Sequence, residues 1–113
     1  MITIYHNPMW SKSRKSVEIL NEQKFEFKII EYMKQGFTEH ELTKLSKKLN
    51  LRFKDFIRTK DQNVKVLDLE NDTEVLNAII NHPKIIERPI IVHKEKAVIA
   101  RPAELLYDFL LNL

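Results

Sequence analysis

Apolar and polar residues follow one another with different spacings along this chain, and the changes in spacing mark its elements. Ile2–Tyr5 is a β-branched and aromatic run that His6-Asn7-Pro8 ends, which is typical of a buried strand entering a turn. Apolar residues then recur at helical spacing over residues 11–23. Residues 24–32 alternate at first and then become apolar, which predicts a second strand. The opening is therefore β-α-β, and a crossover of this length makes its two strands parallel.

The middle of the chain, over about residues 37–82, is predicted to be a helical insertion. Gly36 breaks the preceding pattern. Thr38-Glu39-His40-Glu41 has the spacing of a capping box, which predicts a helix as far as about Leu49. Beyond it we expect, in order, a short helix ending near residue 58, an irregular segment over 60–68, and a helix over 72–82 that His82-Pro83 stops.

The end of the chain is predicted to form a hairpin and a helix. Residues 89–92 and 96–99 are β-rich runs with a hairpin-length gap between them, so we expect antiparallel pairing. Pro102 stands at the first turn of a last helix over 103–111. Its expected core face is Leu105, Leu106, Phe109 and Leu110.

This order of elements predicts an α/β fold with a four-stranded mixed sheet, helices on both faces, and a helical insertion after the second strand. It is the thioredoxin-like, or glutaredoxin-like, arrangement. The chain has 113 residues, which is an ordinary length for one core, so we expect a single domain over residues 1–113.

Composition refines this picture mainly by exclusion. The chain has no cysteine, which removes disulfides, zinc ribbons, iron–sulfur clusters and any mechanism that begins with a thiolate of its own. Its four histidines have no metal-ligand spacing, so no metal site and no cofactor are expected. No run approaches the ~20 apolar residues of a membrane span, and the first run is too short for a signal peptide. We therefore expect a cytoplasmic protein.

The charge is mildly basic, with a formal net charge of +3. A nucleic-acid-binding protein usually concentrates such charge on one stripe. The strongest candidate stripe consists of Lys44, Lys47, Lys48, Arg52, Lys54, Arg58 and Lys60. Charge runs on helices are more often solvated faces, so nucleic-acid binding is the less favoured interpretation.

The turn over residues 5–14 is the first candidate for chemistry. It lies between the first strand and the first helix, where unpaired backbone N–H groups and the helix dipole suit an anion or a thiolate. The same residues also have a purely structural interpretation, in which Pro8 shapes the turn and Ser11 or Ser13 caps the helix.

Three arginines at the ends of predicted elements are the second candidate. Arg88 and Arg101 precede prolines at opposite ends of the predicted hairpin pair, and Arg58 follows the short helix of the insertion. Converging guanidinium groups would hold a tetrahedral oxyanion, whereas singly each arginine is more typical of a surface ion pair. Pro89 is a candidate cis proline, because thioredoxin-like folds place one beside the first helix, but the sequence leaves its isomer undecided.

Four separated blocks, in this order, carry a family resemblance over nearly the whole chain. They are Ile4-Tyr5-His6-Asn7-Pro8 with Ser11-Lys12-Ser13-Arg14, residues 51–60 with Ile57-Arg58-Thr59-Lys60, residues 82–90, and Val98-Ile99-Ala100-Arg101-Pro102. On these blocks the chain resembles the glutaredoxin-coupled arsenate reductase family, which is related to the Spx transcription regulators.

The resemblance implies an oxyanion site that lacks its nucleophile. In that family the residue two positions after the turn proline is the cysteine that attacks arsenate, and this chain has Trp10 there. Glutathione and glutaredoxin supply the further thiols as co-substrates. The resemblance assigns Arg58, Arg88 and Arg101 to oxyanion binding and His6, Asn7, Ser11, Ser13 and Arg14 to the active-site loop.

Three functions remain open from the sequence. The favoured one is a binder of a small oxyanion (arsenate, phosphate or sulfate) or of a small thiol, without normal turnover. The second is a working arsenate reductase that relies on external glutathione or glutaredoxin thiols. The third is an Spx-like protein-interaction module that uses an exposed Trp10 as its anchor, since tryptophan is enriched in interface hot spots.

Overall fold

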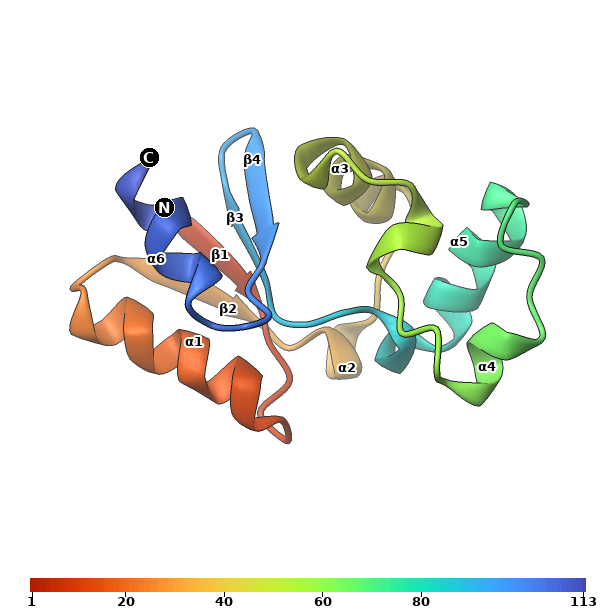
Figure 1. Ribbon diagram of the computed structural model, residues 1–113, viewed down its shortest axis with the longest axis horizontal. Coiled ribbons are helices and arrows are strands. Elements are labelled where there is room, and N and C mark those ends of the chain that lie inside the picture. Colours follow the sequence, from red (N-terminus) through yellow and green to blue (C-terminus); the bar gives the residue numbers. More distant parts are fainter. The chain divides into compact units, whose positions relative to one another are not determined.

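Two segments that are far apart in the sequence build one sheet (Figure 1). The computed structural model describes residues 1–113. Residues 1–32 and 88–113 form one compact unit, called here the sheet unit, and residues 33–87 form a second, called the helical unit. No helix in either unit combines the length and the apolar character that a bilayer span needs.

The sheet is mixed and has the strand order β2-β1-β3-β4. Its strands are β1 (Ile2–Tyr5), β2 (Phe27–Ile30), β3 (Ile90–His93) and β4 (Lys96–Ile99). β1 pairs with β2 in parallel and with β3 in antiparallel orientation, and β3 pairs with β4 in antiparallel orientation. The α/β class, the parallel opening and the antiparallel hairpin are confirmed.

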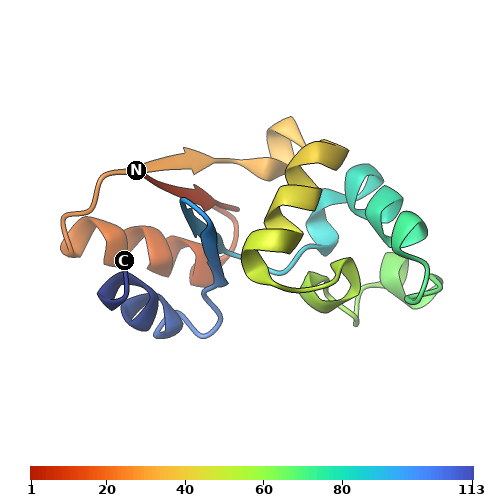
Figure 2. The same ribbon diagram turned by 90° about the horizontal axis from the view of Figure 1, so that it is seen from above.

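One hydrophobic cluster of the sheet unit lies on one face of the sheet. Ile2 and Ile4 alternate along β1 and so point to the same side, where α1 (Ser11–Glu22) and α6 (Leu105–Leu111) pack (Figure 2). The buried cluster consists of Ile2, Ile4, Ile19, Leu20, Ile91, Ala100 and Leu106. This face fixes the start of α1 against the end of β1, where the candidate turn lies.

The last helix differs from its prediction. α6 begins at Leu105 instead of residue 103, because residues 101–104 form a bend and a turn. Leu106 is fully buried, and Phe109 and Leu110, three and four positions later, are half-buried on the same face. Leu105 lies one position off that face and is 41% exposed, so its assignment to the core was wrong.

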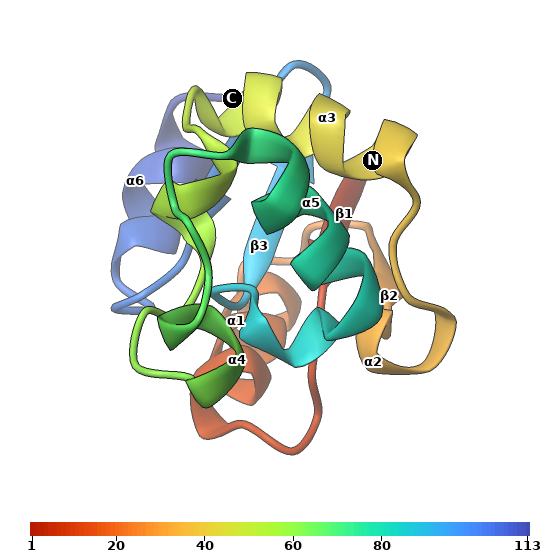
Figure 3. The same ribbon diagram turned by 90° about the vertical axis from the view of Figure 1, so that its right-hand side faces the viewer.

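The helical unit consists of short helices joined by turns, and the first helix starts at the boundary residue Tyr32 (Figure 3). They are α2 (Tyr32–Gln35), α3 (Glu39–Leu49), η1 (Phe53–Phe56), α4 (Gln62–Lys65), α5 (Asp72–Asn81) and η2 (Pro83–Ile85), where η marks a 3-10 helix. The capping box is confirmed: Thr38 Oγ1 accepts from the Glu41 N–H, and Glu41 Oε1 accepts from the Thr38 N–H, each at 3.1 Å.

The segment over 60–68, expected to be irregular, contains α4. Asp61 is its N-cap, and Asp61 Oδ1 accepts a hydrogen bond from the Asn63 N–H at 2.8 Å. This bond holds the pKa of Asp61 below its usual value, since it stabilises the carboxylate. The capping residue was present in the sequence, but a single helical turn has too few apolar positions to show a period.

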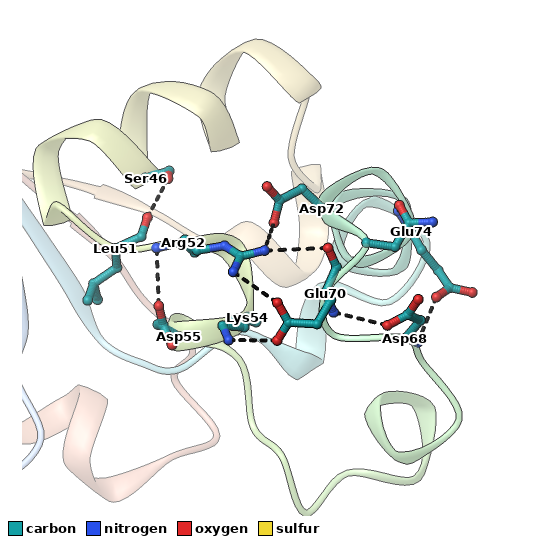
Figure 4. A network of polar contacts seen from close by, with 10 residues as sticks. Ser46, Leu51, Arg52, Lys54, Asp55, Asp68, Glu70, Asp72 and Glu74 are labelled. Atoms are coloured by element: carbon teal, nitrogen blue, oxygen red, sulfur yellow. Dashed lines mark hydrogen bonds and ion pairs between the residues drawn. The ribbon is translucent and has the colours of Figure 1, made fainter.

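An exposed ion-pair network crosses the helical unit from η1 to the start of α5 (Figure 4). Arg52 contacts Glu70 at 3.2 Å and Asp72 at 3.1 Å, and Lys54 contacts Glu70 at 3.0 Å. Hydrogen bonds from Lys54 and Arg52 lower the pKa of Glu70. Exposed pairs of this kind contribute little stability each, so the network mainly neutralises two members of the basic stripe.

Replacing Ile4 by alanine tests the core of the sheet unit. Ile4 is fully buried on the central strand β1, so Ile4→Ala is expected to lower the free energy of unfolding by about 2–5 kcal/mol in a denaturant titration. Ile29 is the control, since it pairs with Ile4 in the register but is 43% exposed on the edge strand β2. A loss as large in Ile29→Ala as in Ile4→Ala would contradict this core.

Candidate functional site

One buried hydroxyl, that of Ser13, holds the turn between β1 and α1 on its buried side. Ser13 is fully buried, and its Oγ accepts a hydrogen bond from the Asn7 N–H at 3.0 Å. The same Oγ lies 2.6 Å from Nδ1 of His6, which is 8% exposed. Ser13 therefore ties the first turn of α1 to the end of β1.

The serine caps expected for α1 are absent. Its N-cap is Trp10, whose side chain makes no capping hydrogen bond, and Ser11 is the exposed first residue of the helix. Ser13, three residues after the N-cap, points back to the strand instead. Asn7 shapes the turn: Asn7 Oδ1 accepts from the Met9 N–H and the Asn7 carbonyl accepts from the Trp10 N–H, both at 3.1 Å.

Folding favours the neutral form of His6 over the protonated form. Burial is the main cause that lowers its pKa below the ordinary 6.5, Arg14 lowers the pKa further, and Glu31 raises it. The Ser13 hydroxyl accepts from the Asn7 N–H and shares one hydrogen bond with His6 Nδ1, in which the imidazole tautomer decides which group donates. Asn7, Ser13 and His6 thus form one hydrogen-bonded chain.

Arg14 closes the turn from outside. Its Nη1 donates to the Pro8 carbonyl at 2.8 Å, although the Arg14 side chain is exposed. The basic residue assigned to the active-site loop thus also braces the backbone that leads to Trp10.

The central contact of the site is between Arg88 and Trp10. Arg88 is 4% exposed, and its Cζ lies 3.7 Å from the centre of the Trp10 ring, within the range of a cation–π interaction. The indole itself is 42% exposed. Trp10 therefore covers the buried guanidinium on one side and meets solvent on the other.

The hairpin register brings Arg88 and Arg101 to one end of the sheet. Ile90 pairs with Ile99, and the Ala100 N–H donates to the Pro89 carbonyl at 3.0 Å, so the next residue on each strand lies at the same edge. The two arginines stand at opposite ends of the hairpin in sequence, and antiparallel pairing brings those two ends together. Arg101 is exposed.

A proline follows each of these two arginines at the end of the sheet. The Arg88–Pro89 and Arg101–Pro102 peptide bonds are both cis. β3 begins directly after Pro89, and Ile90 pairs with Tyr5 at the end of β1. Pro89, the candidate cis proline, therefore lies beside the strand that leads into the turn.

Arg58 belongs to the helical unit. It is half-buried, and its N–H donates to the Ile85 carbonyl at 2.6 Å beside the isolated bridge between Ile57 and Ile86. Its assignment to the oxyanion set stays a prediction from the resemblance.

Together these features define a class of protein: a domain with a thioredoxin-like sheet and a basic site where the first helix begins. A family model described as the ArsC family matches residues 5–109, and the chain belongs to this family. The match includes the turn, the helical unit and both edge arginines.

Individual relatives match nearly the whole length of the chain. The chain is 36% identical to an arsenate reductase of Haemophilus influenzae, with 96% of this chain and 98% of the relative covered. It is 35% identical to an arsenate reductase of Neisseria meningitidis, with 91% and 92% covered. Among solved structures it is similar to an arsenate reductase from Vibrio cholerae, with a TM-score of 0.88, 34% identity and 95% of each chain covered.

A metal site and a nucleic-acid-binding stripe have little support in the structure. No group of three or more His, Asp or Glu side chains lies together in a way that could hold a metal ion. In the basic stripe, Arg52 and Lys54 face Glu70 and Asp72, which reduces the charge available to a nucleic acid.

Replacing His6 tests its neutral, buried state. Because its pKa is lowered by folding, the unfolded chain binds the proton first, so the free energy of unfolding should fall as the pH drops through about 6.5. The slope cannot exceed about 1.4 kcal/mol per pH unit for one group. His6→Asn keeps a polar atom near Nδ1 but does not titrate, so stability measured by denaturant titration should depend less on pH.

The control for this measurement is His40→Asn, on the exposed side of α3. It should keep the pH dependence of the original chain. An unchanged slope in His6→Asn would show that His6 is not the group responsible.

Proposed function

We propose that the sheet unit binds a small tetrahedral oxyanion, of the class of arsenate, phosphate or sulfate, at Arg88 and the start of α1, without a thiol of its own. The observation that carries the proposal is the burial of the Arg88 guanidinium, which is 4% exposed, in a chain with no cysteine. A planar guanidinium binds an oxyanion through paired, charge-assisted hydrogen bonds. Such bonds are stronger where water is excluded than in bulk water.

The start of α1 supports an anion at this place. The N-cap side chain of Trp10 makes no capping bond and the first turn of the helix holds no acidic residue. The helix dipole and the first-turn N–H groups therefore favour negative charge there. The name arsenate reductase, carried by the relatives, favours arsenate as one such anion.

Reduction of a bound arsenate would need thiols from outside the chain. A thiolate must attack arsenic and a second thiol must complete the two-electron reduction, and the indole of Trp10 can do neither. Glutathione or a glutaredoxin is the expected source of such thiols, as external co-substrates and not as bound cofactors.

A second candidate function has its own observation. Met9 is 83% exposed and Trp10 is 42% exposed, at the tip of the turn. Exposed tryptophan suits an interface anchor, so an Spx-like interaction module is the alternative. Binding of a free oxyanion distinguishes the two functions, since an interaction module has no reason to bind one.

Calorimetric titration with arsenate and phosphate tests anion binding. We expect saturable binding that weakens with added salt, because screening reduces charge attraction. Arg88→Ala should weaken it by roughly tenfold to a hundredfold, the usual effect of losing hydrogen bonds to a charged group. Arg88→Lys keeps the charge but loses the planar fork, so it should recover only part of the affinity.

Lys28→Ala is the matched control, since Lys28 is exposed on β2 and its loss changes the net charge equally. It should bind as the original chain does. The resemblance assigns anion binding to Arg101 and Arg58 as well, and alanine variants of each test those assignments separately. Absence of heat with every anion would contradict the proposal and favour the interaction module.

Restoring the thiol tests whether only the nucleophile is missing. In Trp10→Cys the sulfur stands at the N-cap of α1, where the helix dipole and nearby Arg88 should lower the thiol pKa. We expect arsenate-dependent oxidation of NADPH, coupled through glutathione and glutaredoxin, to rise above the rate of the original chain. Trp10→Ser is the control, because serine is similar in size to cysteine but has no redox chemistry. It should show no such rise.

A further inference from the structure

We propose that the turn between β1 and α1 is a docking surface for an acidic protein segment, in which carboxylates flank an apolar side chain. The surface has an apolar tip, which consists of Pro8, Met9 and Trp10, and a basic rim, which consists of Lys12, Arg14 and Lys15. Docking here is independent of anion binding at Arg88, because it uses side chains that face solvent. It gives the alternative interaction function a surface and a partner chemistry.

The tip exposes residue types that protein interfaces bury. Met9 is 83% exposed and Trp10 is 42% exposed, and Pro8 before them is exposed as well. Methionine and tryptophan are enriched in the cores of interfaces, and tryptophan is enriched among the residues that dominate binding energy. A single exposed apolar side chain is ordinary, but three in succession at one turn form a patch that a partner can cover.

Hydrogen bonds hold the backbone of all three tip residues. Asn7 Oδ1 accepts from the Met9 N–H and the Asn7 carbonyl accepts from the Trp10 N–H, both at 3.1 Å. From the helix side, Arg14 Nη1 donates to the Pro8 carbonyl at 2.8 Å and the Arg14 N–H donates to the Trp10 carbonyl at 3.1 Å. A tip that is already ordered loses less conformational entropy when a partner binds it.

The charge around the tip is positive, which selects an acidic partner. Residues 1–17 contain no acidic residue, and the first in the chain is Glu18. Lys12, Arg14 and Lys15 are all exposed, and only Lys15 has an ion pair, with Glu18 at 3.8 Å. Complementary charge guides association and discriminates against wrong partners, so carboxylates are the expected groups opposite the rim.

Arg14 favours a protein partner over an anionic membrane surface. An exposed tryptophan among cations also suits a membrane interface. However, the Arg14 guanidinium is bonded to the Pro8 carbonyl at the tip itself, so the tip would enter hydrocarbon only with this charge or after losing the bond. A charge in hydrocarbon is costly, whereas arginine is enriched in protein interfaces.

Selection of binders from a random-peptide library, displayed on phage, tests the partner chemistry. We expect the peptides that the chain selects to be rich in Asp and Glu around an aromatic or aliphatic residue. A selected peptide is then synthesised and titrated into the chain. Trp10 is the single tryptophan, so its emission reports on the tip and should shift to the blue as the indole leaves water.

Substitutions in the tip and the rim separate the two contributions. Met9→Ser should weaken peptide binding about tenfold, the effect of losing a buried apolar side chain. Leu111→Ser is its control, since Leu111 is also 83% exposed but lies on α6. Lys12→Ala should weaken binding about twofold to fivefold and reduce its dependence on salt, whereas Lys28→Ala, with the same change of net charge, should do neither.

The outcomes also separate docking from anion binding. Selected peptides without an excess of acidic residues, no selected peptide at all, or unchanged binding in Met9→Ser would each overturn the docking surface. A blue shift with vesicles of phosphatidylcholine and phosphatidylserine, but with no acidic peptide, would show a membrane tip instead. Acidic peptides that bind a chain giving no heat with phosphate would support docking and overturn only the anion site.

Discussion

The guanidinium of Arg88 lies under the indole of Trp10, and the candidate site depends on this contact. The cation is nearly sealed from water, so its charge must be balanced locally. The indole face supplies part of that balance, since Cζ lies 3.7 Å from the ring centre. The proposed anion site uses this same guanidinium, which the chain has although it contains no cysteine.

The sheet makes this contact possible. β1 is central, so its end, the turn and the start of α1 lie beside the first residue of β3. The hydroxyl of Ser13 then fixes the turn to His6 and Asn7 from the buried side. Two segments at opposite ends of the chain are thereby held together, and neither contains the site alone.

The sequence predicted most of the fold because its elements have clear periods and stops. The capping box at Thr38 and the antiparallel hairpin are examples. It did not predict the inward hydroxyl of Ser13, because a serine near a helix start is equally typical of a cap. The single turn of α4 was too short to show a period, and the Arg88–Trp10 contact depends on pairing between strands that no local pattern reveals.

The most direct measurement is a proton–nitrogen NMR spectrum of the guanidinium Nε–H of Arg88, recorded while arsenate is added. If the anion binds at the Arg88 guanidinium, this signal should shift progressively and saturate, and the indole N–H signal of Trp10 should shift with the same midpoint. An Arg88 signal that stays fixed while arsenate binds elsewhere on the chain, or does not bind, would contradict an anion site at Arg88.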